Sequence, residues 1–120
     1  MTGIVDEVGQ ALLHVRVKSG VDASETPLEV WIDTGFTGDL VVPQAQINAL
    51  GLQVGSAIKA TLADGSMVQL DAYECLVEWF GTWKRIEVIA NQGRFPLLGV
   101  GLLKNRELNI DYKAKSLNLT

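Results

Sequence analysis

The sequence predicts a mainly β fold with two short helices, closed or nearly closed into a barrel. Short runs that alternate between apolar and polar residues recur along the chain, as in Leu13 to Lys18. Turn-forming dipeptides separate these runs, and two brief stretches of helix-forming residues interrupt them. Short, regularly spaced strands of this kind are typical of β barrels.

The length and composition indicate one domain, spanning residues 1–120, with a core of its own. The chain has 120 residues, of which 48% are hydrophobic, so it can bury a sizeable core without disulfides or metals. It contains one cysteine and one histidine, so neither an internal disulfide nor a zinc-ligand spacing is available. We therefore expect no metal and no other cofactor.

The charge pattern argues against several partners. The net charge is −4, and the ten basic residues are spread thinly, so we expect no nucleic-acid binding. No run reaches the roughly 18 apolar residues of a membrane span, and the N-terminus lacks the basic start of a secretory signal. We expect a cytoplasmic protein with no membrane association.

The first half of the chain predicts four strands and a helix. A strand pair turns at Gly9-Gln10, and the alternation of the second strand places His14 toward solvent. A polar loop follows at residues 19–27. Pro43 suits a first helical turn, and Gly51 suits a helix end. The predicted strands cover residues 3–8, 11–18, 28–32 and 40–42, and the predicted helix covers residues 43–50.

The second half predicts two hairpins and a second helix. Asp64-Gly65 is a strong hairpin signal between two long strands. Cys75, Trp79 and Trp83 fall within strands, where packing against the core explains them. The predicted strands cover residues 52–62, 67–80, 83–90, 95–101, 108–112 and 116–120, and the predicted second helix covers residues 102–107.

The stretch Asp33-Thr34-Gly35 is the main candidate for chemistry. It follows an apolar strand and precedes a second one, so a strand end would hold the Asp33 carboxylate rigidly. Gly35 permits a tight turn, and the Thr34 hydroxyl can both donate and accept a hydrogen bond. Three small or polar residues between strands can also form an ordinary turn, so the motif needs its structural context.

Three features occur in a characteristic order: Asp33-Thr34-Gly35, a hairpin tipped by Asp64-Gly65, and Leu97-Leu98-Gly99 before a short helix. In this order the chain resembles the retropepsin-like aspartic proteases, single-lobe relatives of pepsin with a closed acid-protease barrel. The resemblance covers the chain from about residue 10 and is strongest to bacterial and archaeal members. It implies that Asp33 is the catalytic aspartate and that Thr34 and Gly35 maintain its geometry.

The resemblance also implies a substrate site. The central hairpin would be a flap over the substrate, with residues 63–67 as the flap tip. Leu97-Leu98-Gly99 would cross beneath the catalytic loop and brace it. The residue after Gly35 is usually small in this family, whereas this chain has Phe36, which would fill part of the cleft. The expected substrate-binding residues are Phe36, Ala63, Asp64, Gly65, Ser66 and Met67.

The count of carboxylates then predicts a homodimer. Two carboxylates about 3 Å apart share one proton, so one can activate water while the other polarises a peptide carbonyl. The chain has one Asp-Thr-Gly, so Asp33 from each of two subunits would meet at a two-fold axis. The partners expected are a second copy and an extended peptide or protein substrate.

Other interpretations remain open. Asp111 is a rival carboxylate, although its alternating strand favours a structural role, and Asp39 could cap or line the cleft. The protein could be a dimeric module that binds peptides or a partner protein without catalysis, because a fold survives the loss of its chemistry. A barrel that binds a small molecule is a further alternative, for which the sequence has no polar pocket signature.

Overall fold

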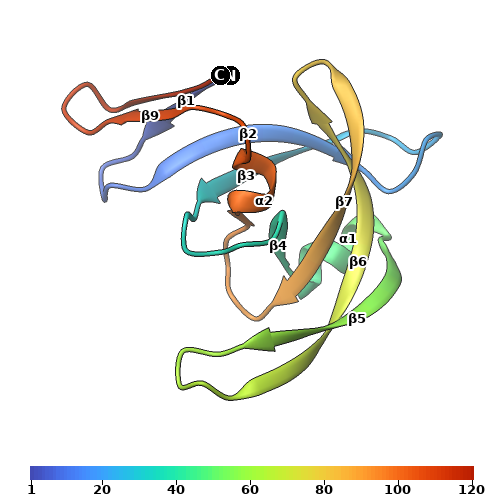
Figure 1. Ribbon diagram of the computed structural model, residues 1–120. Coiled ribbons are helices and arrows are strands. Elements are labelled where there is room, and N and C mark those ends of the chain that lie inside the picture. The colour runs from blue at the N-terminus through green and yellow to red at the C-terminus, as the bar shows by residue number, and fades with distance from the viewer.

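A computed structural model describes the backbone of all 120 residues, and the side chains of all residues except Ser56, Ala57, Ile58, Ala60 and Leu70. The chain forms ten strands and two short helices, as Figure 1 shows. The elements are β1 (Thr2–Val5), β2 (Ala11–Lys18), β3 (Thr26–Ile32), β4 (Leu40–Pro43), α1 (Gln44–Leu50), β5 (Gln53–Thr61), β6 (Met67–Trp79), β7 (Thr82–Asn91), β8 (Leu97–Leu98), α2 (Val100–Leu103), β9 (Leu108–Asp111) and β10 (Ser116–Leu119).

The mainly β fold with two short helices is therefore confirmed. The strands join in the order β5-β6-β7-β4-β8-β3-β2-β1-β10-β9, and β6 also pairs with β2 through Val17↔Val77. This second pairing brings six of the strands, β6-β7-β4-β8-β3-β2, into a ring of pairings. Full closure into a barrel stays a prediction.

The core lies inside this ring. Leu13, Val15 and Val17 of β2 are buried while His14 and Arg16 are exposed, which confirms the alternation predicted for this strand. His14 lies 3.2 Å from Glu29 on the surface. Cys75 and Trp79 of β6 are buried, as expected for packing residues.

The β8 strand is short but central, because it joins two strands that are distant from it in sequence. It runs parallel to β3 through Trp31↔Leu97 and Ile32↔Leu98, and antiparallel to β4 through Leu40↔Leu98. Its position between β3 and β4 places Gly99 directly beneath the segment from Asp33 to Asp39.

The helix α1 lies where it was predicted but begins one residue later, at Gln44, because Pro43 ends β4. Pro43 is its N-cap, and Gly51 ends it in the left-handed conformation, with φ 69°. The second helix differs from the prediction of residues 102–107: α2 spans Val100–Leu103. The amides of Val100 and Gly101 donate to the carbonyls of Phe36 and Gly38. These long-range bonds set the start of α2, and sequence periodicity does not reveal them.

The β5–β6 hairpin turns at residues 62–66, as Asp64-Gly65 predicted. Leu62 and Ser66 close the turn, and Gly65 has φ 86°. Figure 1 shows this hairpin extending away from the ring, and the two chain termini side by side at the opposite end. Among the residues that the structure describes, none of the helices combines the length and apolar character needed to span a bilayer.

Candidate active site

The Asp33 carboxylate sits at the end of β3 in a braced turn. Its backbone amide donates to the carbonyl of Leu98, at 2.9 Å. Its Oδ1 accepts a hydrogen bond from the amide of Gly35, also at 2.9 Å. Asp33 is half-buried, whereas Thr34 and Gly35 are exposed. The carboxylate is thus held in one orientation and still reaches the surface, as a group that acts on a substrate must.

The loop from Asp33 to Asp39 is tied to β8 and α2 by backbone bonds. Gly99 donates to the Asp39 carbonyl at 2.9 Å, and Val100 donates to the Phe36 carbonyl at 2.7 Å. Gly101 donates to the Gly38 carbonyl at 2.9 Å. A segment sixty or more residues away in sequence therefore braces this loop, the position that the resemblance implied for Leu97-Leu98-Gly99.

Three glycines allow this close approach. A methyl group on Gly99 would overlap the Gly38 carbonyl oxygen and the Phe36 ring. A methyl group on Gly101 would overlap the Asp39 carboxylate, and one on Gly38 would overlap the Phe36 ring. The half-buried Phe36 ring thus lies against the backbone of Gly38 and Gly99, at positions where no side chain competes for the space.

Two hollows flank the loop at residues 33–39. The larger, which we call the cleft, has a volume of about 690 Å³ and lies between the loop and strands β5 and β7. The smaller, which we call the side hollow, measures about 290 Å³ and is lined by Trp31, Ile32, Asp33, Thr34 and Leu97. The cleft is lined by Gly35, Phe36, Thr37, Gly38, Asp39, Lys59, Thr61, Glu87, Ile89, Gly101 and Lys104.

The cleft includes Phe36 among the expected substrate-binding residues. The expected flap-tip residues Ala63 to Met67 are exposed and line neither hollow; the cleft instead reaches the β5–β6 hairpin at Lys59 and Thr61 of β5. Sequence reasoning missed these two residues, together with Trp31 and Leu97. The sequence contained a signal for Trp31. Alternation along the strand places it on the same face as Glu29, opposite to Val30 and Ile32, which are buried.

Asp39 and Asp111 both have structural contacts. Asp39 Oδ2 accepts from the amide of Glu87 at 3.3 Å, so this carboxylate links the loop to β7 while lining the cleft. Asp111 Oδ1 accepts from the amides of Lys113 and Ala114, at 3.0 and 2.9 Å, and so holds the β9–β10 turn. These bonds agree with the structural role expected for Asp111.

The side chains of Cys75 and Asp64 have shifted pKa values. Burial, and secondarily the negative charge of Asp39, raises the pKa of the Cys75 thiol from 9.0 to about 12. Hydrogen bonds from the hydroxyl and amide of Ser66 lower the pKa of the exposed Asp64. Cys75 therefore remains a neutral thiol, while Asp64 is an ionised acceptor that holds the hairpin turn.

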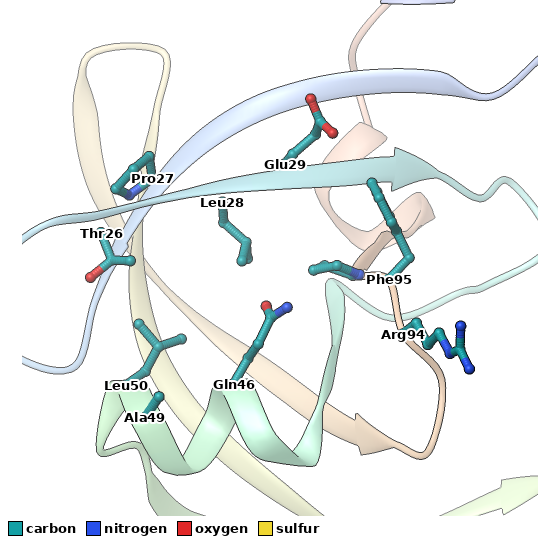
Figure 2. A pocket seen from close by; sticks show the side chains of 10 residues that line it. Thr26, Pro27, Leu28, Glu29, Gln46, Ala49, Leu50, Arg94 and Phe95 are labelled. Atoms are coloured by element: carbon teal, nitrogen blue, oxygen red, sulfur yellow. The ribbon is translucent and has the colours of Figure 1, made fainter. Parts of the chain in front are cut away.

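A third cavity, of about 380 Å³, lies between β3, α1 and residues 94–96. Figure 2 shows Leu28 from β3 and Gln46 from α1 pointing into it. The Gln46 Oε1 is buried and receives no hydrogen bond within the described part of the chain. Asp33, Thr34, Gly35 and the flap tip do not line this cavity, so it is separate from the candidate active site.

Comparison with known proteins supports this interpretation of the fold. No protein-family model matches the sequence, and no curated protein matches it either. Among solved structures, the chain is similar to a retropepsin-like aspartic protease from Rickettsia conorii, with a TM-score of 0.68 and 17% identity, over 99% of this chain and 88% of that one.

Two viral enzymes are also similar. The EIAV protease, solved with the inhibitor HBY-793, has a TM-score of 0.58 and 19% identity over 83% of this chain and 90% of that one. The simian foamy virus protease has a TM-score of 0.51 and 20% identity over 76% of this chain and 91% of that one. At such low sequence identities, the structural similarity shows the fold alone. The chain therefore has the retropepsin-like fold, with Asp33-Thr34-Gly35 in a loop braced by Leu97-Leu98-Gly99.

Proposed function

We propose that the protein is an aspartic endopeptidase that acts as a homodimer. Asp33 from each subunit would form a carboxylate pair that activates a water molecule to hydrolyse an extended peptide. The observation that carries the proposal is the mounting of Asp33: one oxygen is oriented by Gly35, the backbone is anchored to Leu98, and the group borders a hollow.

The orientation of Asp33 suits this chemistry. Within the described part of the chain, Oδ1 is engaged by Gly35 and no side chain or amide donates to Oδ2. The second oxygen is thus available for water or for a partner carboxylate. Asp39 is a poor partner within the same chain because it borders the cleft, not the side hollow, and accepts from the Glu87 amide. A second copy supplies the missing carboxylate.

The remaining roles follow from the surroundings of Asp33. Thr34 is exposed beside it, so its hydroxyl can bond across a two-fold axis. An extended peptide would lie across Asp33, from the side hollow into the cleft, with Phe36 lining the cleft. The flap tip at residues 63–67 would close over the peptide. The closed acid-protease barrel of this proposal would hold these parts in register.

The decisive experiment compares Asp33→Asn with Asp111→Asn in a peptide-library digest from acid to neutral pH. Asp33→Asn should lower cleavage by roughly a thousandfold or more, because the amide cannot take a proton from water. Asp111→Asn is the matched control, since its amide oxygen can still accept from Lys113 and Ala114. Circular dichroism should show both variants folded. Equal activity in wild type and Asp33→Asn would refute the catalytic role.

Mixing subunits tests the shared site. Equal amounts of Asp33→Asn and wild-type protein pair at random, so the concentration of wild-type homodimers falls to about half. Cleavage should therefore fall to about half at an unchanged wild-type concentration. An excess of Asp111→Asn, which is expected to stay active, should not reduce it. Activity that is unaffected by the Asp33→Asn subunit would mean that each chain works alone.

A second candidate function is peptide or partner binding without catalysis. The observation that favours it is Phe36, which occupies the floor of the cleft where a smaller side chain would leave more room. A pepstatin-type inhibitor separates the two functions, because a ligand that binds the folded state raises its melting temperature. Protection in wild type that is lost in Asp33→Asn would support a working carboxylate pair; peptide binding without cleavage would support the module.

A further inference from the structure

The third cavity, between β3, α1 and residues 94–96, has a mostly apolar wall. Leu28, Leu50, Phe95 and Pro96 contribute apolar side chains to it. Its volume of about 380 Å³ lies in the range of small-molecule sites, and an apolar cavity of roughly 150 Å³ already holds benzene. None of the described residues that line it also lines the cleft or the side hollow. The cavity is therefore a separate site with room for a small organic molecule.

Gln46 brings a polar group into this apolar wall. Ala49 and Leu50 follow it by three and four residues, so all three lie on the face of α1 that lines the cavity. Figure 2 shows the Gln46 amide directed into the cavity, opposite Leu28. Its Oε1 is buried and receives no hydrogen bond from any residue whose side chain the structure describes. A buried acceptor without a donor is costly, so a molecule that supplies a donor gains by binding there.

The charged side chains at the edge of the cavity do not point into it. Figure 2 shows the Glu29 carboxylate and the Arg94 guanidinium turned away from Gln46. Glu29 lies 3.2 Å from His14 instead, and Arg94 is exposed. A charged group inside the cavity would lose its water of hydration without meeting an opposite charge. The cavity therefore suits an uncharged ligand.

We propose that this cavity binds an uncharged, largely apolar small molecule with two or more fused rings, whose N–H or O–H group donates to Gln46 Oε1. The ring system would fill the space between Leu28, Leu50 and Phe95, where its apolar surface leaves water. A single water molecule would also satisfy Gln46, but it takes up only about 30 Å³ of this apolar volume. The inference concerns a site apart from Asp33, so it does not rest on the proposed protease function.

The first test uses indole and indene as probes, with binding followed by ligand-detected NMR. Indene has the same two fused rings with a CH₂ group in place of the N–H group. Indole should bind in the millimolar range and roughly fivefold more tightly than indene, because only indole can donate to Gln46. Equal binding of the two probes, or no saturable binding of indole up to about 10 mM, would overturn the proposal.

The second test removes the acceptor. Gln46→Leu keeps a side chain of similar size and helix propensity, so the variant should fold and melt no lower than the wild type. Its affinity for indole should fall roughly fivefold, to that of indene, while indene binding stays within about twofold. An unchanged affinity for indole, or an equal loss of both probes, would show that no donor bonds to Gln46 and would overturn the proposal.

Gln44→Leu is the matched control on the same helix. Gln44 does not line the cavity, and its Nε2 donates to Asn48 Oδ1 at 3.0 Å and to the Tyr73 hydroxyl at 3.3 Å. This variant should therefore lose some stability while keeping the roughly fivefold preference for indole. Loss of that preference in Gln44→Leu as well as in Gln46→Leu would count against a specific bond to Gln46.

Asp33→Asn separates this inference from the proposed function, because Asp33 does not line the cavity. The variant should bind indole within about twofold of the wild type. If it loses cleavage and keeps indole binding, both proposals stand. If indole binds through Gln46 to a protein that never cleaves peptides, the cavity stands and the protease function fails. If cleavage depends on Asp33 but Gln46→Leu binds indole as the wild type does, the protease function stands and this inference fails.

Discussion

The loop at residues 33–39, our candidate catalytic loop, and the hairpin tip at residues 63–67, our candidate flap tip, are both turns between strands, yet they are held in different ways. The loop at residues 33–39 is fixed by backbone bonds to Leu98, Gly99, Val100 and Gly101, all distant in sequence. The flap tip is held by bonds within itself: Ser66 donates to the Asp64 carboxylate, and the amides of Leu62 and Gly65 donate to the carbonyls of Ser66 and Leu62 respectively. The loop should therefore open only with the whole domain, whereas the flap tip can open by itself. The proposed function needs this difference, because the carboxylate must stay in place while the hairpin tip closes over a peptide.

The largest expected effect breaks the brace under the loop. Gly99→Ala places a methyl group into the Gly38 carbonyl and the Phe36 ring, so the free energy of unfolding should fall by about 3 kcal/mol or more. Gly20→Ala is the control, because nothing lies within 4 Å of the added methyl group, and it should change stability by less than about 0.5 kcal/mol. Urea unfolding measures both. Similar stabilities would mean that the brace contributes nothing.

A smaller loss of stability is expected when the aromatic ring of Phe36 is removed from the loop at residues 33–39. Phe36 is half-buried on the backbone of Gly38 and Gly99, so Phe36→Ala should cost roughly 2 kcal/mol. It should also enlarge the cleft, so a peptide library should show larger side chains accepted beside the cleaved bond. Phe36→Leu should keep most of the stability. An unchanged cleavage preference in Phe36→Ala would show that the ring does not limit the cleft.

The buried thiol beside the loop gives a pH-dependent test. Because the pKa of Cys75 is raised to about 12 in the folded protein, its stabilising contribution is complete below the ordinary value of 9.0 and is lost as pH rises toward 12. Thermal unfolding should show stability declining over that window, and less so in Cys75→Ala. At pH 8 a thiol reagent should label Cys75 only after unfolding. Rapid labelling of the native protein would contradict its burial.

The smallest effect is expected at the flap tip. Because hydrogen bonds from Ser66 lower the pKa of Asp64, the contribution of the ionised form is present above the ordinary 3.8 and is lost as pH falls through the lowered folded value. Asp64→Ala should loosen the tip, measured as faster amide exchange at Ser66, without changing the global melting temperature. Asp64→Asn should behave more like wild type, because it keeps the acceptor. A large drop in melting temperature would show that the tip is coupled to the core.

Local signals located most of the elements. Asp64-Gly65 located the flap tip because a left-handed glycine permits a tight reversal, and Pro43 and Gly51 bounded α1 for similar backbone reasons. The predictions were wrong for residues 95–107: the strand predicted at 95–101 is only β8, and the helix predicted at 102–107 is α2, which begins at Val100. The position of α2 depends on carbonyls of Phe36 and Gly38, which no local pattern contains.

The sequence by itself determined the alternation of β2, the hairpin turn, and the delivery of Asp33 by a strand into a glycine turn, because each depends on residues close together in the chain. Only the tertiary structure decided that β8 lies between β3 and β4 and that β1 pairs with β10. The same holds for the hydrogen bond from the Glu87 amide to Asp39 and for the contact of the cleft with the β5–β6 hairpin at Lys59 and Thr61. The physical reason is that these arrangements satisfy backbone donors and acceptors across long sequence separations, and many registers are compatible with the same local pattern.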